Sequence, residues 1–150
     1  MLGLGEAVRE LPREFRGEAP ACVRRAEVFC AGCLVVEGAS YKDDPDLAAR
    51  LAREEVFKDW PLVIVHDDAG VARSAPDFLW ATWTRFEPAS DIHASSTSVR
   101  RHHLSYAAPL VIDARMKPGY PDELVVRPDV GELVTRRWRE YFPEGLNGGD

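Results

Sequence analysis

Residues 61–93 read PLVIVHDDAGVARSAPDFLWATWTRFEPASDIH and carry the clearest structural signals of the sequence. The run LVIV at residues 62–65 is short, apolar and largely β-branched, which predicts a strand buried on both faces. A helix signal follows it, and residues 91–94 predict a second short strand. We expect the rest of the chain to pack around this strand–helix–strand unit.

The helix in this unit has a well-defined start and end. Ser74 is a suitable N-cap, Pro76 suits the first turn, and Asp77 completes a capping box. Pro88 stops the helix, so we expect it to extend to about Phe86.

Two tryptophans of this helix are predicted to lie on different faces. Helical spacing groups four side chains on one face: Leu79, Thr82, Trp83 and Phe86. Trp80 lies away from them, so one tryptophan is expected to face another element or another chain. Trp80, Trp83 and Arg85 are therefore the candidate interface residues.

The remaining sequence predicts alternating helices and strands. We expect three further helices: one over residues 1–16, one that starts with Asp44 as its N-cap, and one over residues 129–141. The further expected strands are residues 27–37 and 109–113. Residues 95–101 are expected to be a mobile loop. This order predicts a single α/β domain, a layered sheet with helices on both faces and mostly parallel strands. We expect an N-terminal helix or arm at 1–20, the domain at 21–145 and a disordered tail at 146–150.

Composition excludes several classes of protein. The net charge is −6, with 25 acidic against 19 basic residues, which argues against nucleic acid or an anionic membrane as a partner. No apolar run approaches the ~20 residues of a membrane helix, and the first residues lack the apolar stretch of a signal peptide. A cytoplasmic location is expected.

The cluster His66-Asp67-Asp68 directly follows the predicted central strand. Ligands of open α/β sheets bind beyond the carboxyl ends of strands, and a histidine beside two carboxylates is able to bind a metal or act as a base. The alternative is an ordinary turn in which the aspartates cap backbone amides.

A second set of possible metal ligands lies downstream, at Asp91, His93 and the adjacent pair His102-His103. Neighbouring side chains on a strand point to opposite faces, which weakens a metal site there. One alternative function is nevertheless a stand-alone metal-dependent enzyme that uses His66, Asp67 and these histidines.

A third polar group surrounds the end of the tryptophan helix. Arg85 in the last turn suits the helix dipole, and it is also able to clamp Asp91, with Glu87 nearby. We interpret this group as structural.

Cys30 and Cys33 form a C-x-x-C spacing, and Cys22 is the third cysteine. A structural zinc needs four ligands, and Cys33 opens an apolar run rather than a helix. Reduced thiols in the core or a loop are therefore expected.

Two segments resemble the C-terminal domain of UbiD-family decarboxylases. Residues 80–92, WATWTRFEPASDI, resemble that family's W-x-x-x-T-R-x-x-P-A-x-D-I segment, and residues 109–118, PLVIDARMKP, resemble its P-L-x-I-D-A-x-x-K-P segment. The preceding PLVIVHDD is similar to the family's strand that leads to a D-D turn. The resemblance extends over residues 33–118, and both segments occur in the family's order.

The resemblance implies a role but no catalytic residue. UbiD-type enzymes use prenylated flavin mononucleotide with a divalent metal and potassium, and they bind these in domains upstream of the matching one. We therefore expect this chain to bind no cofactor or metal itself and to contain no catalytic residue. It is expected to be a small subunit or detached C-terminal domain that supports assembly and closes the active site of a larger subunit.

The expected substrate is an aromatic or unsaturated carboxylic acid. The expected partner is a larger UbiD-like catalytic subunit, self-association, or both. A non-catalytic scaffold is the remaining alternative.

Overall fold

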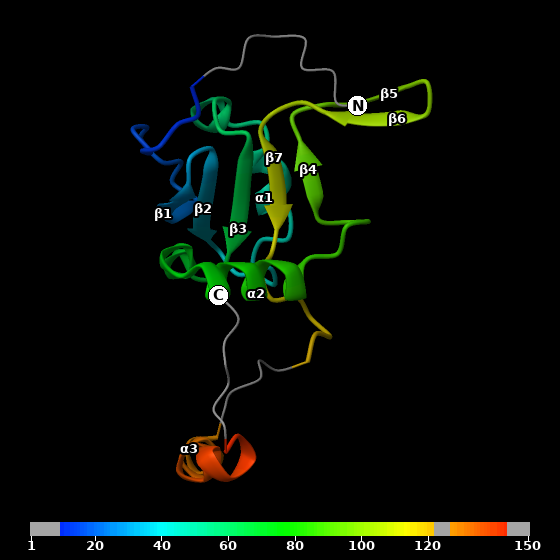
Figure 1. Ribbon diagram of the computed structural model, residues 1–150. Helices are drawn as coiled ribbons and strands as arrows, with labels where there is room; N and C mark the ends of the chain where they lie inside the picture. The colour runs from blue at the N-terminus through cyan, green and yellow to red at the C-terminus, as the bar shows by residue number, and fades with distance from the viewer. Residues whose placement is uncertain (1–9, 122–126, 144–150) are drawn as a thin grey trace. The chain divides into compact units, whose positions relative to one another are not determined.

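The computed structural model describes residues 10–121 and 127–143 (Figure 1). The chain divides into two compact units, Met1–Tyr120 and Pro121–Asp150. The first unit contains the sheet and the elements packed on it. The second contains one helix among its described residues, α3 (Pro128–Tyr141). The predicted tail at 146–150 lies outside the described residues.

The first unit is built on a five-stranded mixed sheet in the order β1-β2-β3-β7-β4. These strands are β1 (Val23–Cys30), β2 (Cys33–Gly38), β3 (Leu62–His66), β7 (Leu110–Asp113) and β4 (Ile92–Ala94). The central strands β2, β3 and β7 are parallel, whereas β1 and β4 pair antiparallel at the two edges. The α/β class is confirmed, but the prediction of a mostly parallel sheet is wrong.

The antiparallel edges arise from chain reversals that the sequence pattern conceals. The strand predicted over 27–37 is in fact the hairpin β1–β2, with Ala31 and Gly32 at its turn. Gly32 has φ +80, a left-handed conformation that glycine adopts without steric cost. A two-residue turn can only join antiparallel strands, because parallel strands need a crossover connection.

The predicted mobile loop at 95–101 is also part of a hairpin. It consists of β5 (Thr97–Arg100) and β6 (His103–Tyr106), which form a separate two-stranded sheet. Arg101 and His102 occupy the turn with φ 50 and φ 66, the positive angles of a type I′ hairpin turn. The glycine or asparagine usual in such turns is missing, so the local sequence contains no hairpin signal.

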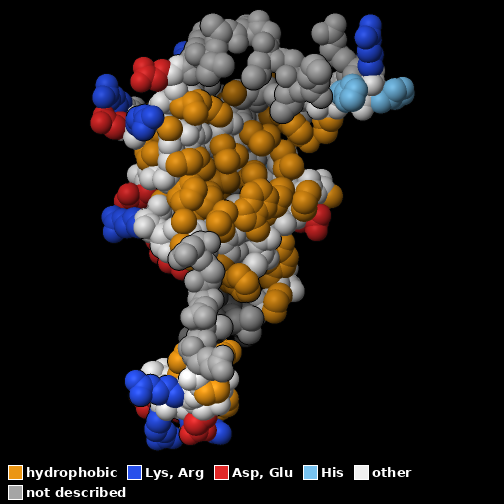
Figure 2. Space-filling model, viewed as in Figure 1, with side chains coloured by type: hydrophobic (Ala, Val, Ile, Leu, Met, Phe, Trp, Pro, Cys, Tyr) orange, Lys and Arg blue, Asp and Glu red, His pale blue; other side chains and the backbone are white. Residues whose placement is uncertain are grey.

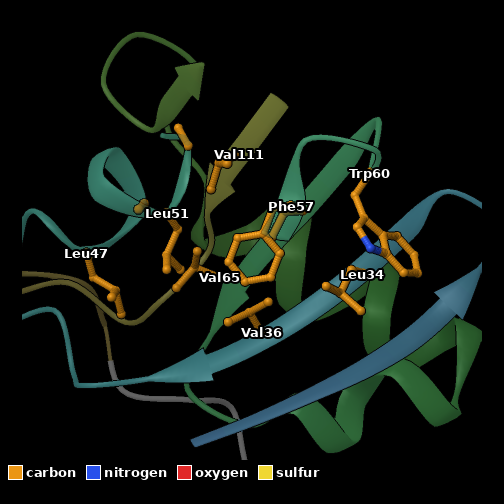
Figure 3. Close-up of a cluster of buried hydrophobic side chains, with 11 residues drawn as sticks. Leu34, Val36, Leu47, Leu51, Phe57, Trp60, Val65 and Val111 are labelled. Carbon is orange, nitrogen blue, oxygen red and sulfur yellow. The ribbon is translucent and has the colours of Figure 1, made fainter. Parts of the chain in front are cut away.

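The central strands bury side chains on both sides. In β2, Leu34 and Val36 enter one cluster, and Cys33 and Val35 enter another. The first cluster is completed by α1 (Leu47–Leu51), the 3-10 helix η1 (Glu55–Phe57) and Trp60 (Figure 3). The second is completed by the 3-10 helix η2 (Ala69–Arg73) and by α2 (Ala75–Arg85). Burial on both sides explains why these strands read as continuous apolar runs.

Two elements expected in the N-terminal part of the chain differ from the described structure. The helix predicted from Asp44 begins only at Leu47, because the Asp44 carboxylate instead binds the Arg50 side chain at 2.5 and 2.7 Å. Residues 10–16 contain no helix, and the earlier part of the predicted helix 1–16 lies outside the described residues. Phe15 from this segment stacks on Phe57 of the core, with ring centroids 5.7 Å apart.

Helix α2 starts as predicted but presents different faces. The Ser74 hydroxyl accepts a hydrogen bond from the Asp77 amide at 3.4 Å, which confirms the cap. The buried face holds Phe78, Ala81 and Thr82. Leu79, Trp80 and Trp83 all lie on the exposed face. The predicted separation of the tryptophans is wrong, because residues three apart lie on one side of a helix.

Candidate functional site: a polar network at the carboxyl ends of the central strands

A buried polar network lies where β3 and β7 end, beside the end of α2. It joins three segments that are far apart in the sequence: the HDD turn after β3, the end of α2 with the loop to β4, and residues 113–117. The segments that carry the family resemblance therefore meet in space. Two of the three predicted polar clusters, that of His66 and that of Arg85, belong to this one network.

His66 is held neutral in this network. Its side chain is only 2% exposed, and burial is the main cause that lowers its pKa below the ordinary value. Arg85 Nη1 lies 3.2 Å from His66 Nε2 and can only donate, so Nε2 accepts. The ring proton is then on Nδ1, which lies 2.9 Å from the Asp68 carbonyl oxygen. The Asp68 amide is 3.0 Å from the same nitrogen, but the Arg85 contact favours Nδ1 as donor.

Asp67 connects this histidine turn to the segment after β7. Its Oδ2 accepts a hydrogen bond from the Met116 amide at 2.7 Å and lies 3.5 Å from Arg85 Nη1. Asp68 caps the following 3-10 helix through the Gly70 amide at 2.7 Å. Both aspartates therefore act on backbone amides, as the alternative interpretation of the cluster predicts.

Arg115 and Asp113 form a fully buried ion pair. The guanidinium makes two bonds to the carboxylate, Nη2 to Oδ2 at 2.6 Å and Nε to Oδ1 at 2.9 Å. Its remaining nitrogen donates to the carbonyl oxygens of Ala39 and Asp44, both at 2.9 Å. The side chains are 0% and 1% exposed. The pair thus ties the end of β7 to the chain between β2 and α1.

Lys117 forms the second buried ion pair, with Asp91. Its Nζ lies 2.9 Å from Asp91 Oδ2 and donates to the carbonyl oxygens of Arg85 and Asp113 at 3.0 and 2.9 Å. Asp91 also accepts from the Glu87 amide at 2.7 Å. The clamp on Asp91 that the sequence suggested for Arg85 is therefore supplied by Lys117.

Tyr41 lies over two cations of this region. Arg115 and Lys117 are 5.3 and 5.5 Å from its ring centroid, distances at which a cation is attracted to an aromatic face. Three ion pairs between described residues lie in the network: Arg85–Asp67, Arg115–Asp113 and Lys117–Asp91. Ion pairs between segments that are far apart in the sequence are suited to holding those segments together.

His102 and His103 lie at the end of the sheet opposite to His66. β4 is antiparallel to β7, with Ala94 opposite Leu110, the first residue of β7. The hairpin that holds His102 and His103 therefore lies at the end of the sheet where the central strands begin, whereas His66 is the last residue of β3 (Figure 1). Among the described residues, no group of three or more His, Cys, Asp or Glu side chains could hold a metal ion. The structure does not assemble the alternative metal enzyme from His66 and these histidines.

The exposed face of α2 is the second notable feature of this region. Leu79, Trp80 and Trp83 are 50%, 61% and 57% exposed. Figure 2 shows hydrophobic side chains gathered over the face of the first unit that is turned to the viewer. The third candidate interface residue, Arg85, is different: its side chain is 12% exposed and points into the network. Exposed apolar clusters of this kind commonly mark protein interaction sites.

Sequence reasoning missed Asp113, Arg115 and Lys117 as members of the site. In the sequence, these three residues were recognised only as part of the segment that resembles the UbiD family. Their spacing of two places them on one side of an extended chain, and this was the available signal.

Comparison with known proteins supports a relationship to decarboxylases. The chain is 40% identical over 143 residues to a Chlamydia pneumoniae protein that is named as one of the subunits of 4-hydroxybenzoate decarboxylase, a match that covers 95% of this chain. The predicted relationship to UbiD-type decarboxylases is confirmed. An uncharacterised protein of Chlamydia trachomatis serovar D is 39% identical over 143 residues and 95% of the chain. The chain spans 24% of the length of each of these relatives.

Other comparisons add little. No protein-family model matches the chain. Vanillic acid decarboxylase of Sedimentibacter hydroxybenzoicus, in an open form, aligns with a TM-score of 0.42 and 19% identity over 77% of this chain and 27% of that one. A likeness this distant carries no argument about function.

No helix among the described residues is long and apolar enough to cross a membrane.

Proposed function

We propose that this chain is a small subunit, or the C-terminal part, of a UbiD-type decarboxylase or carboxylase. The observation that carries the proposal is the match to the protein named for 4-hydroxybenzoate decarboxylase, at 40% identity over 95% of this chain but 24% of the relative. The chain corresponds to one portion of such a protein. The catalytic apparatus then belongs to a larger partner in the cytoplasm.

In this proposal the chain supports assembly and closes one side of the partner's active site. Two observations support an assembly role. The ion pairs of the polar network join segments within this chain, and α2 exposes two tryptophans and a leucine. Covering these side chains would remove a large apolar area from water, at roughly 25 cal/mol per Å².

The proposal assigns prenylated flavin mononucleotide, the divalent metal and potassium to the larger partner. The described residues of this chain offer no cluster of three His, Cys, Asp or Glu side chains suited to a metal. The substrate class that we propose is an aromatic or unsaturated carboxylic acid. The first probe is 4-hydroxybenzoate, because the relative is named after its decarboxylation.

Purification from native cells tests this proposal. The tagged chain is used as bait at physiological salt, and the recovered proteins are identified by mass spectrometry. We expect a larger UbiD-like polypeptide in near-equal amount, and release of carbon dioxide from 4-hydroxybenzoate or a related acid by the purified complex. Recovery of this chain alone, in the presence of the larger protein in the lysate, would contradict the proposal.

A non-catalytic scaffold makes a different prediction. It would also bind the larger protein, but that protein would keep its full turnover when this chain is omitted. Turnover with and without the chain therefore separates the two functions.

A further inference from the structure

The C-x-x-C pair lies across the β1–β2 hairpin and has no role in the function proposed above. Cys30 ends β1, Cys33 begins β2, and the two residues are directly paired across the strands. Ala31 and Gly32 form the turn between them. Directly opposed residues of antiparallel strands have Cα atoms about 4.5–5.5 Å apart. This lies within the range of about 4.4–6.8 Å that a disulfide requires.

A β-bulge helps to bring the two side chains to one face. The pairing steps from Val28 opposite Leu34 to Cys30 opposite Cys33, so β1 contains one extra residue, Phe29. Phe29 packs with Cys33 in the second hydrophobic cluster. Burial and the neighbouring Cys30 thiol together raise the pKa of the Cys33 thiol. Direct cross-strand pairing therefore places the two cysteine side chains beside each other.

The two thiols differ in the way that an exchange reaction requires. Cys30 is exposed to solvent, whereas Cys33 is 5% exposed. Burial, with a further contribution from Cys30, raises the pKa of Cys33 to about 12. At neutral pH, Cys30 is the thiol able to meet an external disulfide, and Cys33 is placed to react only with Cys30.

We propose that Cys30 and Cys33 form a site of reversible thiol–disulfide exchange with a low-molecular-weight disulfide such as glutathione disulfide. The Cys30 thiolate attacks one sulfur of glutathione disulfide, the S–S bond breaks, and one glutathione thiolate leaves. The Cys33 thiol then loses its proton and attacks the Cys30 sulfur of the mixed disulfide. The second glutathione leaves as a thiolate and takes up that proton. Two protein thiols are oxidised, and one glutathione disulfide is reduced to two thiols.

The position of the pair connects its oxidation state to the packing of the N-terminal segment. The Gly32 amide donates to the Pro12 carbonyl oxygen at 2.8 Å, and the Leu62 amide donates to the Gly32 carbonyl oxygen at 3.1 Å. The turn is thus held between residues 10–16 and the start of β3. A disulfide between Cys30 and Cys33 would join the two ends of this turn.

Mass spectrometry of the whole purified chain tests the proposal. The protein is treated with excess glutathione disulfide, remaining thiols are blocked with N-ethylmaleimide, and trypsin is added without reductant. Cleavage after Arg25 and Lys42 places both cysteines in peptide 26–42, while cleavage after Arg16 and Arg24 places Cys22 in a separate peptide. We expect peptide 26–42 to be unlabelled and lighter by two hydrogen atoms, and dithiothreitol to restore labelling at both cysteines.

Variants at Cys33 and at Cys22 distinguish the roles of the cysteines. Cys33→Ala, which keeps a small buried side chain, is expected to accumulate a glutathione adduct at Cys30, at least tenfold above the wild-type level at the end of the reaction. Cys22→Ser is expected to form the link as the wild type does. Peptide 26–42 that keeps two labels, or a wild-type Cys30 adduct that never resolves, would overturn the proposal. Neither result depends on finding a decarboxylase partner.

Discussion

Lys117 Nζ lies 2.9 Å from Asp91 Oδ2, and this pair joins the two segments that carry the family resemblance. Asp91 belongs to the segment after α2, and Lys117 to the segment after β7. The side chains are 10% and 5% exposed, so water screens their attraction little. The contact explains physically why the two segments need these residue types together.

Replacement of Lys117 by methionine should destabilise the chain strongly. The change leaves the Asp91 carboxylate buried without its cation, which typically costs about 3–5 kcal/mol. The free energy of unfolding, measured with urea, checks this. Arg16→Ala is the control, because the Arg16–Glu14 pair is 83% and 68% exposed and should contribute little. Equal small losses in both variants would show that the Lys117 pair does not hold the segments.

The Arg115–Asp113 pair should show strong coupling between its members. Arg115→Met alone leaves a buried carboxylate unpaired, and we expect a loss of about 3–5 kcal/mol. The double variant Arg115→Met with Asp113→Leu should recover at least ~1 kcal/mol, because it removes both charges. Recovery will be partial, since the carbonyls of Ala39 and Asp44 lose their donor. If the double variant loses as much unfolding free energy in urea as Arg115→Met and Asp113→Leu lose together when measured singly, this coupling is absent.

The exposed and buried faces of α2 should respond differently to truncation. Phe78 is buried and stacks on Phe29 with ring centroids 3.8 Å apart, so Phe78→Ala should cost about 3–5 kcal/mol in the isolated chain. Trp80→Ala should change that stability by roughly 0.5 kcal/mol or less. In binding to the larger partner, however, Trp80→Ala should lose about 2 kcal/mol or more, as buried interface tryptophans do. Calorimetry measures both quantities, and unchanged binding would remove Trp80 from the interface.

Stability should fall as the pH decreases through the range in which free histidine titrates. Burial lowers the pKa of His66 from its ordinary 6.5, so in that range the unfolded chain binds more protons than the folded chain. The contribution is fully present above the unfolded pKa and is lost as the pH falls through the folded pKa. Between about pH 7.5 and about pH 5, wild-type protein should lose more unfolding free energy than His66→Gln. Identical pH profiles would contradict the buried neutral state of His66.

Local sequence signals predict the elements that local chemistry determines. The strand β3 and the Ser74 cap of α2 both follow from short runs of sequence and are present. The hairpin at Gly32 escapes prediction because the residues on both sides of a tight turn form one β-favouring run. The antiparallel pairing of the two edge strands follows from such reversals, so the sequence does not predict it either.

The site could be predicted only in part. His66, Asp67 and Arg85 stand out from their positions at element ends, and the structure brings these three together. The predicted partner of Asp91 is wrong, because Lys117 and Asp91 meet only after β7 has paired with β3 and β4. Pairing between distant segments depends on topology, which local spacing does not encode. The exposure of both tryptophans was missed for a simpler reason, an incorrect division of helix faces.

Turnover of the larger partner with and without this chain is the decisive experiment for the proposed function. The measurement is carbon dioxide release from 4-hydroxybenzoate, or the acid that the native complex accepts, by the cofactor-loaded larger protein. We expect addition of an equal amount of this chain to raise turnover at least tenfold, and Trp80→Ala with Trp83→Ala to remove most of the increase. Full turnover by the larger protein alone, unchanged when the chain is added, would show that this chain does not complete the enzyme.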